Sequence, residues 1–210
     1  MNILITGSKG FVAKNLIAKL KSLKIYKIYL YNRSTNEKTL SKFLTKADII
    51  FHLAGTNRSK VKNKFNDDNF KLTKKIITNL NNLSKNTPIL YSSSIMANDN
   101  SLYGKSKLRA EKIINNYAIK TKSNSKIFRL TNIFGKWSKP DYNSVVATFC
   151  YYLVRDKKLP NVENPSYFFD SDVLKVDISL DIVNGISNEK VKTINDKYLI
   201  PLNIDSNFEY

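Results

Sequence analysis

Short apolar runs alternate along the first part of the chain with longer segments in which apolar residues recur every three or four positions. The short runs are typical of buried parallel strands, and the longer segments are typical of helices that cover a sheet. We expect strands at Asn2–Thr6, Lys27–Tyr31, Asp48–Leu53, Ile89–Ser93 and Lys126–Leu130. We expect helices at Phe11–Leu23, Thr39–Thr45, Lys64–Leu83 and Lys105–Tyr117.

Strands that alternate with helices of this length need crossover connections, which are right-handed when the strands are parallel. The pattern therefore predicts an α/β fold with a Rossmann-like, doubly wound parallel sheet. After Gly135 the pattern changes to a polar and aromatic loop, Lys136–Ser144, and then to an apolar helical segment, Val145–Arg155. A last apolar run, Lys197–Leu202, comes close to the end of the sequence.

We interpret residues 1–210 as one domain. Residues 1–135 would form mainly the sheet core, and residues 136–210 would form mainly a small C-terminal substrate lobe together with the last core elements. The final stretch shows no recognisable capping pattern, so a truncated lobe is an open alternative.

The composition excludes several classes of protein. No apolar run is long enough to span a membrane and the start of the sequence predicts a strand instead of a leader peptide, so we expect a cytoplasmic protein. The single cysteine, Cys150, cannot form an internal disulfide, and we expect it in the core on a helix. The single histidine, His52, leaves no cluster with metal-ligand spacing, so we expect no metal and a strand-end role for this residue.

The formal net charge of +18 raises nucleic acid as a partner, because clustered basic residues bind phosphates. The excess is mostly lysine, it is spread along the chain, and it accompanies many asparagines, which indicates a composition bias of the whole proteome. We therefore do not expect nucleic-acid binding as the main function. A basic surface would still attract anionic substrates such as nucleotides.

The turn between the first expected strand and helix carries small residues at Gly7, Gly10 and Ala13. Backbone N–H groups and the positive end of a helix can face a pyrophosphate there, and the small residues permit close approach. An ordinary strand-to-helix turn is the alternative. On the dinucleotide interpretation, the cofactor-binding residues of this turn are Gly7, Ser8, Lys9, Gly10, Phe11 and Val12.

The end of the second strand indicates which dinucleotide is bound. Proteins that prefer NAD usually place an acidic residue there for the ribose hydroxyls, whereas this chain has Asn32, Arg33 and Ser34. Arg33 can pair with a 2′-phosphate, which favours NADP(H), although an ordinary surface arginine is the alternative. After the third strand, the backbone would lie close to the adenosine and ribose at Leu53, Ala54 and Gly55.

Tyr103 and Lys107 are four residues apart, so on a helix they share one face. An ammonium in that place favours the charged form of the neighbouring phenol and so lowers its pKa. The pair is therefore a candidate for acid–base chemistry beside the dinucleotide.

Four motifs carry a resemblance to a known family. They are Thr-Gly-x-x-Gly-Phe at Thr6–Phe11, His-Leu-Ala at residues 52–54, Ser-Ser-Ser at residues 92–94, and Tyr-x-x-x-Lys at Tyr103–Lys107. Together they resemble the extended short-chain dehydrogenase/reductase (NAD-dependent epimerase/dehydratase) superfamily. More narrowly, Leu90–Ile95 and Asn132–Tyr151 are similar to the N-terminal reductase domain of CapF-type capsular polysaccharide synthesis enzymes.

The resemblance implies an NADPH-dependent reductase of the C4 ketone of a UDP-2-acetamido-2,6-dideoxy-4-ketohexose, on a capsule or O-antigen route of the UDP-N-acetyl-L-fucosamine type. Tyr103 would donate the proton to the developing alkoxide. Lys107 would hold the pKa of the phenol nearer neutrality and contact the nicotinamide ribose. Ser94 would hydrogen-bond the carbonyl oxygen, with Ser93 as the alternative.

The superfamily places an asparagine that contacts the nucleotide-sugar at the position of Asn132. In the loop that follows, cations can bind the diphosphate and aromatic rings can cover the uracil or the sugar. The further candidate substrate-binding residues are Lys136, Trp137, Lys139, Tyr142 and Asn143. Trp137 and Tyr142 could instead pack the lobe. The resemblance also implies a homodimer through the helix at Lys105–Tyr117.

Three alternatives stay open. An epimerase or dehydratase that retains its NAD(P) is one, although Ile95-Met-Ala97 after Ser94 lacks the acidic pair that is usual in dehydratases. A catalytically inactive NADP-binding module is the second, and a nucleic-acid-binding protein is the third. CapF-type proteins continue into a metal-binding cupin domain that epimerises C3, which this sequence lacks, so such an epimerase would be a separate protein.

Overall fold

The computed structural model describes residues 1–57, 59, 65–142 and 144–158. The predicted site residue Asn143 and the apolar run Lys197–Leu202 lie outside the described residues. The chain divides into two compact units, Met1–Arg129 and Leu130–Tyr210. The single domain with a division after residue 135 stays a prediction.

A five-stranded sheet organises the first unit. Its strands are β1 (Asn2–Thr6), β2 (Lys27–Tyr31), β3 (Ile49–His52), β4 (Ile89–Ser94) and β5 (Lys126–Leu130). The spatial order is β2-β1-β3-β4-β5, and β1 pairs in parallel with β2 and β3, as β3 does with β4. The predicted α/β doubly wound sheet is confirmed. The bounds of β1, β2 and β5 are those predicted, while β3 is shorter and β4 runs one residue further.

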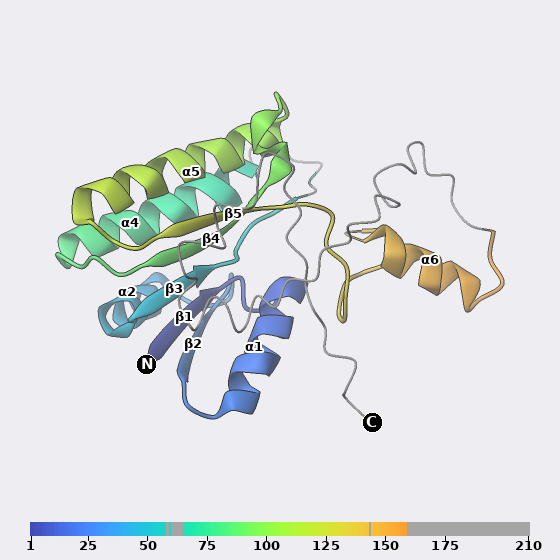
Figure 1. Cartoon of the computed structure of the whole chain (residues 1–210), viewed down its shortest axis with the longest axis horizontal. Coiled ribbons are helices and arrows are strands. Elements are labelled where there is room, and N and C mark those ends of the chain that lie inside the picture. Colours follow the sequence, from blue (N-terminus) through green and yellow to red (C-terminus); the bar gives the residue numbers. More distant parts are fainter. Residues whose placement is uncertain (58, 60–64, 143, 159–210) are drawn as a thin grey trace, which may run out of the picture. The chain divides into compact units, whose positions relative to one another are not determined.

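Helices connect these strands (Figure 1). They are α1 (Phe11–Leu23), α2 (Glu37–Lys46), α4 (Leu72–Asn82) and α5 (Leu102–Thr121), with a short 3₁₀ turn, η2 (Ile95–Asn98), before α5. The single helix expected over Lys64–Leu83 is instead a π-helix, η1 (Asn66–Lys71), that leads into α4. The second unit contains α6 (Val145–Leu153).

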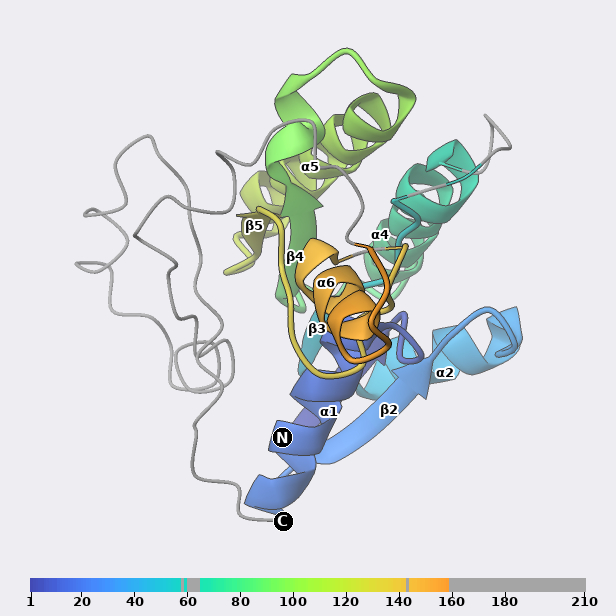
Figure 2. The same cartoon turned by 90° about the vertical axis from the view of Figure 1, so that its right-hand side faces the viewer.

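Successive side chains of β1 point to opposite faces of the sheet, and each face is covered by helices. Leu4 packs in a buried cluster with Leu44 of α2, Ile76 of α4 and Ile114 of α5, so these three helices cover one face of the sheet. Helix α1 lies on the opposite face, as the two perpendicular views show (Figure 1 and Figure 2). Both faces of the sheet are therefore covered at β1, which agrees with the buried apolar run of residues 3–5 in this strand.

The chain leaves β1 toward β2 on one side and later places β3 on the other side. The strand order thus reverses between β1 and β3, whose last residues, Thr6 and His52, stand side by side in the register. In open α/β sheets, ligands bind at the carboxyl ends of the strands where the order reverses. The segments that follow β1, β2, β3 and β4 are therefore the place to look for a site.

None of the helices in the described ranges combines the length and the apolar character that a membrane crossing requires.

Candidate functional site

The turn after β1 can only be built with glycine at position 7. Gly7 has a φ of +69°, and a Cβ there would lie 2.7 Å from the Cα of Ala54. Gly10 then begins α1 in an extended conformation with no side-chain cap, and the first turn holds no acidic residue. The positive end of α1 is thus open to an anion, and buried Ala13 keeps the helix close to the sheet. The turn fits a dinucleotide pyrophosphate.

Polar side chains join this turn to the end of β2. The Asn32 Nδ2 donates to Ser8 Oγ at 3.3 Å, and the Lys9 Nζ donates to Ser34 Oγ at 3.3 Å. The Asn32 Oδ1 in turn accepts bonds from the backbone and the hydroxyl of Ser34, at 3.0 and 2.6 Å. The residues predicted to bind the adenosine end of a dinucleotide therefore lie together.

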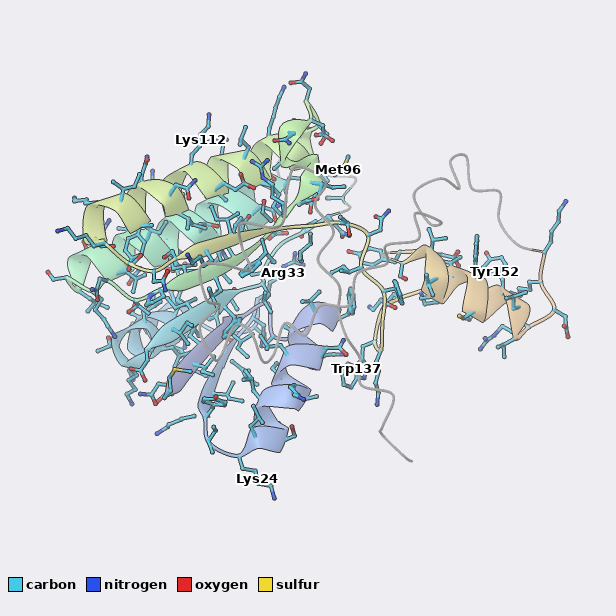
Figure 3. All side chains as sticks on the ribbon, viewed as in Figure 1. Lys24, Arg33, Met96, Lys112, Trp137 and Tyr152 are labelled. Atoms are coloured by element: carbon cyan, nitrogen blue, oxygen red, sulfur yellow. The ribbon has the colours of Figure 1, made fainter. Side chains whose placement is uncertain are left out.

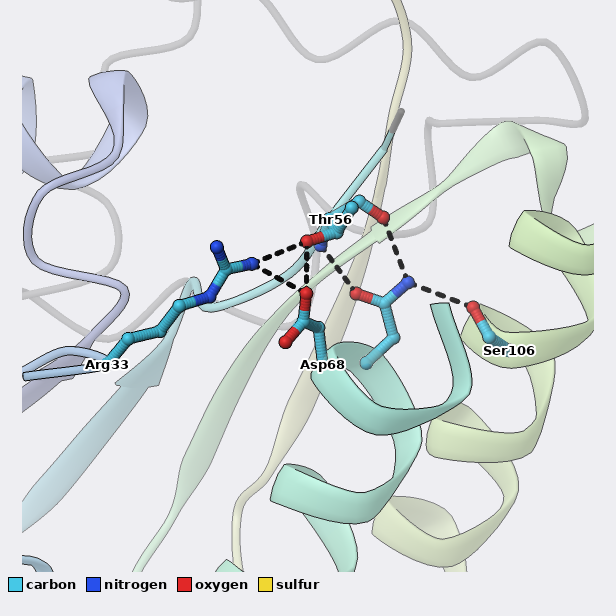
Figure 4. A network of polar contacts seen from close by, with 5 residues as sticks. Arg33, Thr56, Asp68 and Ser106 are labelled. Carbon is cyan, nitrogen blue, oxygen red and sulfur yellow. Dashed lines mark hydrogen bonds and ion pairs between the residues drawn. The ribbon is translucent and has the colours of Figure 1, made fainter. Parts of the chain in front are cut away.

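Arg33, which is labelled in the view of all side chains (Figure 3), extends from the end of β2 to the segment after β3 (Figure 4). Its Nη2 donates to Thr56 Oγ1 at 2.7 Å and to Asp68 Oδ2 at 2.6 Å. The side chain of Arg33 is nevertheless 69% exposed, so it stays accessible from solvent.

His52 is a buried structural residue at the end of β3. The Thr73 hydroxyl donates to the Asn69 carbonyl, so it must accept the Nε2–H of His52 at 2.8 Å. The Nδ1 then accepts the hydroxyl proton of Thr6 at 2.7 Å. Burial, and secondarily the charge of Lys107, lower the pKa of His52 to about 3, so the ring is neutral. This agrees with a strand-end role.

Ser94 ends β4 and caps the following 3₁₀ turn, because its Oγ accepts the backbone N–H of Met96 at 3.2 Å. Tyr103 lies in the first turn of α5, whose N-cap is Ser101. Gly104 allows the two segments to meet, since a Cβ there would lie 2.1 Å from the Met96 carbonyl oxygen. The Ser94 hydroxyl thus comes near enough to the Tyr103 phenol to lower the pKa of that phenol as a hydrogen-bond donor.

The pKa of Tyr103 is raised above its usual value, mainly by burial. The hydrogen bond from Ser94 favours the phenolate and acts in the opposite direction, and the charge of Asp99 adds to the rise. The expected lowering of this pKa by Lys107 is not found, because loss of hydration outweighs the favourable contacts. The phenol is therefore protonated at neutral pH.

Lys107 lies one helical turn beyond Tyr103 and is buried. Its Nζ donates to the Ser92 carbonyl at 2.8 Å and lies 5.9 Å from the centre of the Tyr103 ring. Burial lowers the pKa of Lys107 to about 8, while the charge of Glu111 opposes the change. A Cβ on Gly55 would lie 3.2 Å from this Nζ, so the ammonium stands beside the segment after β3.

Glu111 was missed by the motifs, although it extends the spacing of Tyr103 and Lys107 by another four residues. Arg129 binds its carboxylate through two nitrogens, at 2.9 and 2.6 Å, in a largely buried pair. Ser93 donates to the same carboxylate at 2.5 Å. Ser93 is thereby engaged away from Tyr103, which favours Ser94 as the serine that faces the phenol.

Thr56, Asp68 and Asn69 were also missed. No sequence motif marks them, because their role depends on the π-helix η1. The only signal is the polar run Asn66–Asn69 at the start of a segment that otherwise has the period of a helix, and such polar runs are too common to mark a site.

The predicted substrate-binding residues fall in the second unit, and their role stays a prediction. Asn132 and Lys139 are exposed in the loop after β5, and Tyr142 is 42% exposed. Trp137 has a φ of +68° and its ring lies 5.0 Å from the Nζ of Lys136. The half-exposed ring shows that this aromatic residue is not fully packed in a core.

The expectation of a core position for Cys150 is wrong. The residue lies on α6, as expected, but it is exposed and borders an open pocket with Phe134 and Tyr151. Thr148, two positions earlier and so on the opposite side of the helix, is the buried residue of α6. Among the described residues, no group of His, Cys, Asp and Glu could hold a metal ion.

Comparison with known proteins agrees with this geometry. A model of the NAD dependent epimerase/dehydratase family matches residues 3–167. A UDP-2-acetamido-2,6-beta-L-arabino-hexul-4-ose reductase of Pseudomonas aeruginosa is 38% identical over 156 residues, which are 74% of this chain and 42% of that protein.

Solved structures give the same result. The capsular polysaccharide assembling protein CapF of Staphylococcus aureus superposes with a TM-score of 0.67 at 42% identity, over 78% of this chain and 43% of that chain. The UDP-glucuronic acid 4-epimerase of Bacillus cereus in complex with NAD shares the fold at 18% identity, with a TM-score of 0.65 over 76% of this chain and 65% of that chain. The chain thus spans less than half of the reductase and of CapF, and it belongs to the NAD-dependent epimerase/dehydratase family.

Proposed function

We propose that the chain is a cytoplasmic NADPH-dependent reductase that converts the C4 ketone of a UDP-2-acetamido-2,6-dideoxy-4-ketohexose to an alcohol. The observation that carries the proposal is the grouping of Ser94, Tyr103 and Lys107 at the carboxyl ends of the strands, next to the turn at Gly7. The names of the Pseudomonas reductase and of CapF support the substrate class and a role in capsule assembly.

The chemistry needs a hydride at the carbonyl carbon and a proton at its oxygen. A bound nicotinamide supplies the hydride. Tyr103 supplies the proton, since its phenol is protonated at neutral pH. Ser94, which bonds the phenol, holds the carbonyl oxygen of the sugar in line with it. The Lys107 ammonium favours the phenolate that remains until solvent restores the proton.

The residues around the first two strands support NADP(H) over NAD(H). The turn at Gly7 and the uncapped start of α1 fit a pyrophosphate. The three residues that follow β2 include no carboxylate for two ribose hydroxyls, and the exposed Arg33 is a partner for a 2′-phosphate. Asn32, Ser34 and Lys9 add polar groups around the same place.

NADPH absorbance tests the proposal, with the 210-residue protein and the enzymatically prepared ketosugar. We expect NADPH to be consumed faster than NADH at equal concentration. Tyr103→Phe should lower kcat by about 100- to 10,000-fold while NADPH still binds, because only the proton donor is lost. Binding of NADPH without consumption in the parent protein would contradict the reductase and favour an inactive cofactor-binding module.

A further inference from the structure

The guanidinium of Arg33 is held at one corner only. Its Nη2 donates both to Thr56 Oγ1 at 2.7 Å and to Asp68 Oδ2 at 2.6 Å. Within the described part of the chain, Nη1 and Nε have no partner. The N–H groups of Nε and Nη1 therefore remain as donors for a phosphate oxygen.

The two acceptors that hold Arg33 are themselves fixed. The Thr56 hydroxyl donates to Asp68 Oδ2 at 2.5 Å, so the three side chains form a closed triangle (Figure 4). The carboxylate is more sheltered than the arginine, with side-chain exposures of 22% and 69%. Asp68 thus acts as an anchor, and the arginine is the exposed partner.

The anchor is joined to helix α5 through a buried residue. The amide of Asn69 accepts the backbone N–H of Thr56 at 2.8 Å and donates to the Thr56 carbonyl at 3.1 Å. Its Nδ2 also donates to Ser106 Oγ at 2.9 Å, and Ser106 donates to the Tyr103 carbonyl at 2.6 Å. The position of Thr56 is therefore set by the same helix that carries Tyr103 and Lys107.

We propose that Asp68, together with Thr56, is a positioning residue for the adenosine 2′-phosphate, because it fixes Arg33 through Nη2 and leaves the N–H groups of Nε and Nη1 to bind the phosphate. The inference rests on the proposed preference for NADPH. An arginine on a free side chain must lose rotamer freedom on binding, and a tethered one has already lost it. The preference for NADPH is then set partly by a residue that lies 35 positions after Arg33.

Calorimetric titration of the 210-residue protein with NADPH and with NADH tests this without any turnover. Asp68→Asn keeps the shape of the anchor and removes its charge. We expect this change to weaken the binding of NADPH about three- to tenfold, which is the range expected for the loss of an exposed ion pair and of one ordered side chain. The affinity for NADH should stay within about twofold. Thr56→Val should act in the same direction. Glu37→Gln, which removes the carboxylate of the exposed pair with Lys75, is the matched control and should change neither affinity.

A double-mutant cycle separates anchoring from a general structural effect. In an Arg33→Met background, Asp68→Asn should no longer change NADPH affinity, since there is no guanidinium to position. Equal weakening of NADPH and NADH by Asp68→Asn would overturn the proposal, and so would tighter NADPH binding, which would make Asp68 a competitor of the phosphate. If the parent protein binds NADH as tightly as NADPH, the cofactor preference fails first, and the role of Asp68 fails with it.

Discussion

At the scale of the residue, the chemistry depends on a lysine that is charged although it is buried. Lys107 has one backbone acceptor at 2.8 Å, and its Nζ lies 4.9 Å from the ring of Tyr91 and 5.9 Å from that of Tyr103. The carboxylate of Glu111, one turn further along α5, opposes the loss of this charge. Glu111 therefore helps to keep Lys107 charged, although its own carboxylate is bound by Arg129.

The pH dependence of kcat/KM should report this lysine. Because the pKa of Lys107 is lowered to about 8, kcat/KM should fall as the pH rises through that value. Because the pKa of Tyr103 is raised, titration of its phenol cannot cause a fall of kcat/KM near pH 8. Glu111→Gln should move the limb to lower pH, and Lys107→Arg should abolish it because a guanidinium stays charged. A profile that is flat up to pH 10 would contradict this account.

The motifs identified several of these residues from the sequence because their spacing has a direct meaning on a helix or in a turn. Tyr103 and Lys107 share a helix face, and Gly7 stands where a Cβ has no room. The role of Asp68 could not be predicted, since it depends on contacts between segments far apart in the chain. The wrong prediction for Cys150 has another cause. When most residues of a helix are apolar, the sequence does not show which side of the helix is covered.

At the scale of the element, the site depends on how β4, η2 and α5 are joined. The Asp99 carboxylate accepts the backbone N–H and the hydroxyl of Ser101, at 2.9 and 2.5 Å. Ser101 in turn caps α5 by accepting the N–H of Gly104 at 2.9 Å. The serine at the end of β4 and the tyrosine in α5 are therefore held by one short connection.

Gly104→Ala should disrupt this connection. Its methyl group would lie 2.1 Å from the Met96 carbonyl oxygen and 2.2 Å from an Asp99 carboxylate oxygen, so backbone must move. We expect a loss of about 1–3 kcal/mol in urea unfolding and a fall in kcat beyond what the stability explains. Exposed Lys105→Ala, one position later, is the control and should change stability by less than about 0.5 kcal/mol.

Strand bounds were predictable because buried parallel strands are continuous apolar runs. The helix expected over Lys64–Leu83 was not, because the wider turn at its start depends on tertiary contacts of Asn69. That side chain is fully buried and bonds to the segment after β3 and to α5. Local sequence cannot encode such bonds.

His52 links β1, β3 and η1–α4, and it should make stability depend on pH. The folded-state pKa of about 3 lies below the unfolded value, so unfolding takes up a proton as the pH falls below about 6.5. Stability is therefore full above that value and declines toward acid. Between pH 7.5 and 5.5 the free energy of unfolding should drop by about 1 kcal/mol, measured by urea titration. A constant free energy over this range would contradict a buried, neutral ring.

At the scale of the whole molecule, a homodimer is the proposed assembly. Helix α5 leaves Leu102 and Ile119 exposed, at 52% and 79%. Light scattering after size-exclusion chromatography should give a mass about twice the chain mass of 24.1 kDa. Ile119→Lys should lower the measured mass toward that of one chain. A monomer at micromolar concentration would contradict the dimer and leave the chemistry of each chain untouched.

The net charge of +18 belongs to the same scale, because it attracts any anionic ligand. The sequence predicts this charge and the doubly wound sheet, whereas the order of the strands comes from the structure. The sequence does not predict how the loop after β5 contributes to substrate binding. Lys136, Trp137 and Tyr142 are of types that suit a nucleotide-sugar, but residue type alone does not give their positions.

Deuterium transfer from NADPH that carries deuterium at both positions of the nicotinamide C4 would show whether the hydride ends on the sugar. After reaction with the UDP-4-ketosugar, the product is examined by proton NMR. We expect one deuterium at C4 of the sugar and one NADP⁺ for each product, and Tyr103→Phe should form both at least about 100-fold more slowly. A changed sugar without deuterium and without net NADPH oxidation would contradict the reductase, because an epimerase or a dehydratase returns the hydride it removed.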